Sequence, residues 1–174
     1  MPNIKFGDRE RRHVIEVIEK LKEIKLIQIA NYKKFLQGTD GAYYCIVGGT
    51  GDWHGIPNEV MTSAIKDYSN FYLAIARLLK TKIELYMGPI KPLVDSRASL
   101  THTQRGDFHF DLNTPTDNRL PIKQVPPARF YKIYEFGYDV EDVRDTDRRI
   151  RKFLKNCSPE QLSQLRELYI KFGI

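Results

Sequence analysis

The hydrophobic period of the chain changes near residue 82, and this change constrains the fold more than any other feature of the sequence. Between Val60 and Leu79 the apolar residues recur every three or four positions, the spacing of an amphipathic helix that begins at Pro57. Beyond Lys82 the apolar residues alternate with polar ones or form short runs, as they do in β-strands. Separate helical and extended regions are typical of the α+β class.

Several segments have the composition of β-strands. One is rich in Tyr and β-branched residues and stops at a Gly-Gly pair, and the later ones alternate or are strongly aromatic. These segments are Ala42–Val47, Ile83–Met87, Asp107–Leu112 and Arg129–Tyr138. We therefore predict a mostly antiparallel sheet of four to five strands.

Helices are predicted to cover this sheet. A long N-terminal helix begins at Arg9 and continues to Gly38, although Lys25–Ala30 is apolar enough to form a short strand instead. The helix from Pro57 is central, and two more helices close the chain, one over residues 144–155 and one from Ser158 to Gly173.

The length and composition fit one domain. A chain of 174 residues, of which 41% are hydrophobic, can bury about 70% of the surface that its unfolded form exposes. We predict a single α+β domain over residues 1–174. Asn113–Ala128 holds four of the nine prolines and is predicted to be an exposed loop, either a docking arm for a partner or a plain connection.

The cysteines exclude two classes of small protein. Cys45 and Cys157 are far apart and form no CxxC pair, so neither a disulfide-stapled mini-protein nor a structural zinc site of the usual thiolate spacing is expected. No apolar run approaches the roughly 18 residues of a membrane span, so no membrane partner is expected. The sequence predicts a cytoplasmic protein.

The net charge of +6 permits a polyanionic partner such as nucleic acid. The positive charge is spread along the chain, and it concentrates only in the helix expected over residues 144–155. Five basic side chains share one face of that helix and are candidates for phosphate contact: Arg144, Arg148, Arg151, Lys152 and Lys155. A solvated helix face, with acids first and bases last as the helix dipole favours, explains the same pattern.

A glycine-rich segment from Gly48 to Gly55 lies between a predicted strand and the helix that begins at Pro57. Backbone N–H groups at such a position can hold an anion, and a nucleotide-like ligand would fit there. The candidate ligand-binding residues are Gly49, Gly51, Asp52, Trp53 and His54. The glycine spacing matches neither the dinucleotide fingerprint nor the P-loop, and a tight turn with a capping Asp explains it as well.

The strand Asp107–Leu112 places three polar side chains on one face. Asp107, His109 and Asp111 are two residues apart, so they can hold a divalent metal or provide a general acid and base. The His-x-Asp pair lacks the second His of an iron facial triad, which excludes that oxygenase site. An amphipathic strand with one wet face gives the same alternation without any chemistry.

A second group of polar residues precedes this strand. Arg97, His102 and Arg105, together with His109 and a contribution from His54, resemble the His and Arg sets of metal-independent ribonucleases. In such sites one imidazole is the base, the other is the acid, and a guanidinium stabilises the charged phosphorane. We predict a catalytic set of His102, His109, Asp107, Asp111, Arg97 and Arg105.

The aromatic strand Arg129–Tyr138 is a further candidate for nucleic-acid contact. Alternation would place five side chains on one face: Phe130, Lys132, Tyr134, Phe136 and Tyr138. Aromatic rings beside cations are what a single-stranded nucleic acid needs for stacking and phosphate contact. A core strand has the same composition.

Two functions of different class follow from these patterns. The first is a nucleic-acid-binding protein that acts as a phosphodiesterase or nuclease, with a divalent metal as the candidate cofactor. The second is a non-catalytic domain that binds a small, nucleotide-like anion through the Gly48–Gly55 segment, or that assembles with a partner or as a homo-oligomer.

Overall fold

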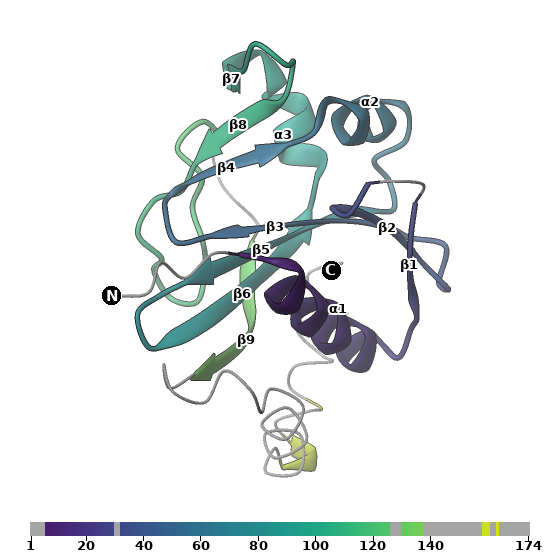
Figure 1. Ribbon diagram of the computed structural model, residues 1–174, viewed down its shortest axis with the longest axis vertical. Helices are drawn as coiled ribbons and strands as arrows, with labels where there is room; N and C mark the ends of the chain where they lie inside the picture. The colour runs from purple at the N-terminus through teal and green to yellow at the C-terminus, as the bar shows by residue number, and fades with distance from the viewer. Residues whose placement is uncertain (1–5, 30–31, 126–129, 138–157, 161–162, 164–174) are drawn as a thin grey trace.

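The computed structural model describes residues 6–29, 32–125, 130–137, 158–160 and 163, and these form two β-sheets with three α-helices (Figure 1). The six-stranded sheet has the order β1-β2-β3-β5-β6-β9, and the three-stranded sheet has the order β4-β8-β7. The helices are α1 (Asp8–Lys22), α2 (Asn58–Lys66) and α3 (Lys91–Asp95). The strands are β1 (Leu26–Gln28), β2 (Phe35–Gly38), β3 (Tyr43–Gly49), β4 (Trp53–Ile56), β5 (Phe71–Leu78), β6 (Lys82–Pro89), β7 (Thr101–His102), β8 (Phe108–Asp111) and β9 (Tyr131–Gly137).

The α+β class is confirmed, but the predicted single, mostly antiparallel sheet of four to five strands is wrong, because the described residues form nine strands in two sheets. The larger sheet is mixed, because β3 and β5 pair in parallel while its other neighbouring strands are antiparallel. Parallel neighbours need a crossover connection, and here the crossover contains β4 and α2. This crossover is the origin of the second, smaller sheet.

The predicted central helix is half helix and half strand. Helix α2 ends at Lys66, and a turn follows in which Asp67 accepts hydrogen bonds from the backbone and the hydroxyl of Ser69. The chain then returns as β5, the inner strand between β3 and β6. A strand buried on both faces is apolar at nearly every position, so its sequence lacks the alternation that separates strand from helix.

The N-terminal helix is also shorter than predicted, and the alternative of a strand near residue 25 is right. Glu23 has a left-handed backbone conformation with φ 56° and ends α1. The Glu19 carboxylate accepts a hydrogen bond from the backbone N–H of Leu26 at 2.8 Å, which fixes the start of β1. The chain then forms the β1–β2 hairpin at the edge of the sheet.

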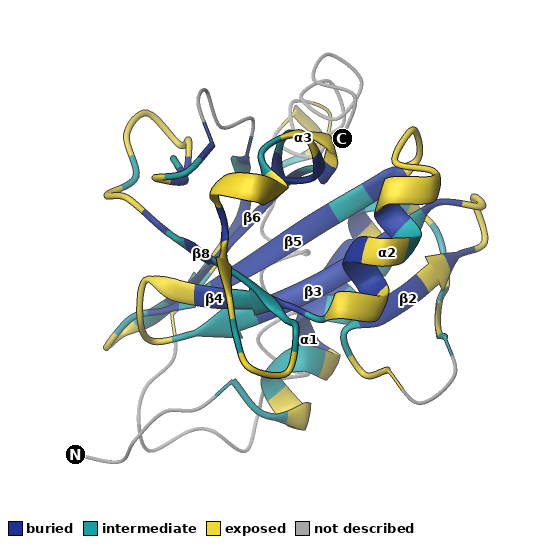
Figure 2. Ribbon diagram, turned by 90° about the horizontal axis from the view of Figure 1, so that it is seen from above, coloured by how far each residue is buried: buried dark blue, intermediate teal, exposed yellow. Residues whose placement is uncertain are grey.

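Both faces of the large sheet are covered. Helix α1 packs on one face, and α2, α3 and the small sheet lie over the other (Figures 1 and 2). The core on the α1 side contains Val14, Ile18 and Ile46, and the core on the other side contains Val47, Met61 and Phe110. The small sheet is therefore packed as a layer over β3 and β5.

The proline-rich segment 113–128 is not simply an exposed loop, as far as residue 125. Leu120, Ile122 and Val125 are buried in the core beneath the small sheet. The Leu120 backbone N–H donates to the carbonyl of Phe130 at 2.9 Å, which ties the segment to the start of β9. The few apolar residues of this segment do not repeat with the period of a helix or a strand. The sequence pattern therefore did not predict their contribution to the core.

The C-terminal predictions lie largely outside the described residues. The helix expected over residues 144–155 falls entirely outside them, as does most of the helix expected from Ser158.

A buried carboxylate ties β5, β6 and β9 together. Glu84 lies 2.9 Å from Lys82, 3.3 Å from Arg77 and 3.7 Å from Lys132, and its side chain is 7% exposed. The Tyr86 hydroxyl donates to the same carboxylate at 2.9 Å. Burial by itself would raise the pKa of Glu84, but the hydrogen bonds from Lys82 and Tyr86 and the nearby positive charges outweigh it, so the pKa lies below its ordinary value.

We predict that Glu84→Gln lowers the free energy of unfolding by about 2–3 kcal/mol, because it removes the buried carboxylate that three cations share. Glu135→Gln is the matched control, since Glu135 contacts the same lysines but its side chain is 41% exposed, and it should cost less than about 1 kcal/mol. Urea unfolding of both variants measures the difference. Equal losses would show that burial of Glu84 does not matter.

Candidate functional site

The small sheet presents one face to the core and one to the surface. Residues directly opposite each other in an antiparallel pair share a face, and successive residues alternate. Trp53 pairs with Asp111 and Gly55 pairs with His109, so these four positions share the outer face. His54, Ile56, Phe108 and Phe110 share the inner face, where Ile56 and Phe110 are fully buried.

Trp53 and His109 stack on this outer face. Their ring centroids are 3.6 Å apart and the ring planes are 22° from parallel. Gly55 makes room for the imidazole, because a Cβ there would lie only 2.7 Å from His109 Cε1. The Trp53 side is nevertheless open, and the residue is 55% exposed. The result is a flat aromatic surface that is supported from one side.

The charges around the stack are mixed. Lys34 lies beside it and donates to the carbonyl of Gly55 at 3.4 Å, and Lys123 is exposed next to Asp111, whose carbonyl accepts its backbone N–H at 2.9 Å. Burial lowers the pKa of His109, with Asp107 acting in the opposite direction. The Nδ1 atom of His109 is buried and has no hydrogen-bond partner among the described residues.

The predicted catalytic set does not assemble around a common point. His102 pairs with Phe108 and therefore lies on the face opposite His109, with its ring 4.4 Å from that of Phe108. Arg97 donates to the carbonyl of Val94 at 2.8 Å, and Arg105 is exposed in the turn before β8. Alternation along a strand separates the two imidazoles, so they cannot serve as an acid and base pair in this arrangement.

The predicted metal ligands have other partners. Asp107 accepts a hydrogen bond from the backbone N–H of Asn58 at 3.3 Å, and so caps the first turn of α2. Asp111 is held by Gln124, and His109 by the stack with Trp53. Within the described ranges, no three His, Cys, Asp or Glu side chains are grouped so that they could hold a metal ion. His109 and Asp111 share a face of β8, whereas Asp107 precedes the strand and contacts α2.

The glycine-rich segment does not lead directly into a helix. Gly49 ends β3, His54 and Gly55 belong to β4, and α2 begins only after that strand. The anion position at the start of α2 is taken by the Asp107 carboxylate. The predicted contact of the glycines with the start of a helix is not made, because β4 lies between them and α2.

The other predicted residues of this segment have structural contacts. His54 is buried and donates from Nε2 to the carbonyl of Gly51 at 3.0 Å, and burial lowers the pKa of its imidazole. Asp52 lies 3.7 Å from Arg77. Gly51 has open space around it. Of the predicted ligand residues, Trp53 has the exposed ring that a ligand could contact.

The aromatic strand does not place the predicted aromatic and basic side chains on one face. A bulge opposite Leu85 and Tyr86 shifts the register of β9 and changes which face its side chains occupy. Tyr134 and Phe136 pack toward α1, where the His13 ring lies 4.0 Å from that of Phe136, and Phe130 is fully buried. Lys132 binds Glu84 and Glu135. Tyr138 and the basic residues from Arg144 to Lys155 lie outside the described residues.

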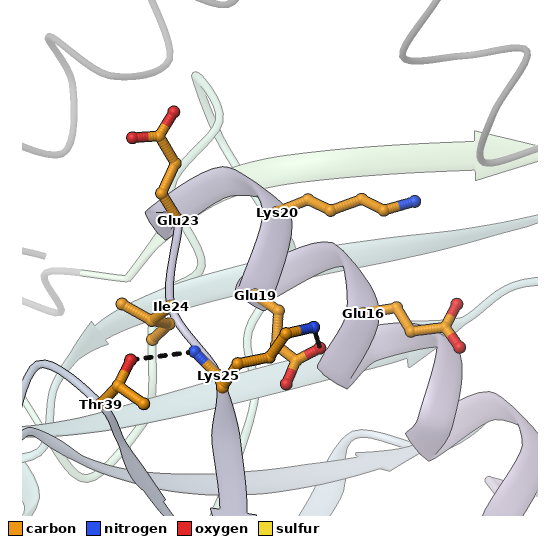
Figure 3. Close-up of a pocket in the computed structure, with 7 residues that line it drawn as sticks. All are labelled: Glu16, Glu19, Lys20, Glu23, Ile24, Lys25 and Thr39. Atoms are coloured by element: carbon orange, nitrogen blue, oxygen red, sulfur yellow. Dashed lines mark hydrogen bonds and ion pairs between the residues drawn. The ribbon is translucent and has the colours of Figure 1, made fainter.

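A polar hollow of about 540 Å³ lies on the other side of the large sheet, between α1 and the start of β1 (Figure 3). Three of its lining residues bind one another: the backbone N–H of Lys25 donates to Thr39 at 3.1 Å, and its ammonium donates to Glu19 at 3.4 Å. These contacts explain the hollow as the junction between α1 and the β1–β2 hairpin.

The stack gives a direct structural test. We predict that Gly55→Ala displaces the His109 ring, changes the fluorescence emission of Trp53 and lowers stability by about 1–3 kcal/mol, because the new methyl group overlaps the imidazole. Trp53 is the sole tryptophan of the chain, so its emission reports this site alone. Gly51→Ala is the control, since a Cβ there meets no atom within 4 Å. Unchanged emission in Gly55→Ala would contradict the stacked arrangement.

The histidines also predict a pH dependence. In the folded protein the pKa values of His54 and His109 lie below the ordinary value of about 6.5, so the unfolded chain binds more protons near that pH. The free energy of unfolding should therefore fall as the pH drops below about 6.5, down to the folded pKa values. Urea unfolding at pH 7.5 and pH 5.5 measures the loss.

His54→Gln should reduce this pH-dependent loss, because it removes the more deeply buried of these two imidazoles. His102→Gln, at an exposed position of the same sheet, controls for the loss of a histidine. If the free energy of unfolding falls by the same amount in both variants, the pH dependence arises from titratable groups other than His54.

Among the helices that the structure describes, none combines the length and apolar character needed to cross a bilayer. Comparison of the chain with protein families, with curated proteins and with solved structures found no match.

Proposed function

We propose that this protein binds single-stranded nucleic acid without cleaving it, and that Trp53 stacks against a base. The observation that carries the proposal is Trp53, which is more than half exposed and is stacked against His109 on the outer face of the small sheet. Every base has a π face, and stacking on an exposed aromatic ring contributes about 1–3 kcal/mol per base. Support from His109 means that little conformational freedom is lost on binding.

Cations near the stack support phosphate contact. Two lysines lie close to the stack of Trp53 on His109: Lys34 donates to the carbonyl of Gly55, and the backbone of Lys123 bonds to Asp111. The chain also carries a net charge of +6. A single-stranded nucleic acid with a base stacked on Trp53 would have its phosphates within reach of these two lysines. In this proposal the basic residues Arg144, Arg148, Arg151, Lys152 and Lys155 provide further phosphate contacts.

Binding is favoured over catalysis because of the positions of the two imidazoles. General acid–base cleavage of a phosphodiester needs two groups near one phosphate, whereas His102 and His109 occupy opposite faces of the small sheet. The proposal also keeps the cytoplasmic setting expected from the sequence, which the buried thiol of Cys45 suits.

We predict that a fluorescently labelled single-stranded octamer binds and that Trp53→Ala weakens its affinity about tenfold, because the base loses its stacking surface. Tyr68→Ala is the matched control, since Tyr68 is also exposed but lies beyond the opposite end of α2. Fluorescence anisotropy measures both. The dissociation constant should rise steeply between 50 and 200 mM salt, because phosphate contacts release counterions.

Three results would count against this function. Equal affinity in wild type and Trp53→Ala would show that no base stacks on Trp53. Salt-independent binding would show that the protein makes no phosphate contacts. Cleavage of the octamer by wild type, lost when His109 is substituted, would show that the protein is a nuclease instead of a binding protein.

A further inference from the structure

We infer that Asp111 makes the platform selective for bases that carry an exocyclic amino group, such as cytosine, over bases that carry a carbonyl there, such as uracil. This inference rests on the proposed binding of a base by Trp53. Asp111 pairs directly with Trp53 across β4 and β8, so the two side chains leave the sheet from neighbouring positions on one face. A base stacked on the indole would have its edge near that carboxylate.

Gln124 holds the carboxylate in a fixed position. Its Nε2 donates to Asp111 Oδ2 at 2.7 Å, and its Oε1 accepts the backbone N–H of Asp111 at 3.0 Å. The two residues thus form a closed pair, and the Asp111 side chain cannot turn freely. No group in the described part of the chain donates a hydrogen bond to the other oxygen, Oδ1. That oxygen is available as an acceptor beside the stacking surface.

The chemistry of the base edge then decides the preference. A carboxylate only accepts hydrogen bonds, so it pairs with the N4 amino group of cytosine and repels the O4 carbonyl of uracil. Lys123 does not change this preference for an amino group. Its contact with Asp111 is made by the backbone, and its side chain is exposed. The sheet therefore supplies stacking that accepts any base and one acceptor that distinguishes among them.

The test compares two single-stranded DNA octamers, one of deoxycytidine and one of deoxyuridine, which differ at the edge of the pyrimidine but share the backbone and charge. Wild type should bind the cytosine octamer about tenfold more tightly, as expected for a hydrogen bond to a charged acceptor. Asp111→Asn should bring the ratio close to one. The ratio is the readout because loss of a negative charge strengthens binding of both polyanions equally.

Asp52→Asn is the control for charge, since Asp52 precedes Trp53 but its carboxylate lies toward Arg77, and this variant should keep the wild-type ratio. Trp53 emission shows whether each variant retains the stack. A ratio near one in wild type, or a ratio that survives in Asp111→Asn, would overturn the selectivity while leaving the proposed function intact. Failure of wild type to bind either octamer would overturn the proposed function itself.

Discussion

The parallel pairing of β3 with β5 at the centre of the large sheet is the constraint on which the rest of the structure depends. Their register runs from Tyr43 with Phe71 to Gly49 with Arg77, and both strands are covered on both faces. Because parallel strands cannot be joined by a hairpin, the connection must leave the sheet and return over one face. That connection supplies α2 and β4, and β4 recruits β8 and β7 into the small sheet.

The candidate site is a consequence of this layered arrangement. The small sheet has one face in the core and one in solvent, and the register of β4 on β8 brings Trp53, His109 and Asp111 together on the solvent side. Gly55 is essential because it is the position opposite His109, where any larger residue would push the imidazole away from the indole. The inner face of the same strands packs Ile56 and Phe110, which anchors the platform.

Strand prediction succeeded where alternation or flanking glycines marked a segment, and it failed for β5, which has neither signal. The alternation in Asp107–Leu112 predicts β8, and the run that stops at the Gly48-Gly49 pair predicts β3. Phe71–Leu78 has no such alternation because β5 is buried on both sides, and it was assigned to a helix. The aromatic strand was located correctly, but the register shift in its pairing with β6 places Lys132 on the face opposite Tyr134 and Phe136.

The sequence by itself determined which residues are candidates for a site: Trp53 was identified in the glycine-rich segment, and His109 and Asp111 in the strand Asp107–Leu112. It also determined that His109 and Asp111 share a face, because that follows from the two-residue period of a single strand. Only the tertiary structure decided that Trp53 stacks on His109, and that His102 lies on the opposite face. Contacts between segments about 50 residues apart depend on strand register, which is set by packing of the inner face and by turns, and no local pattern encodes it.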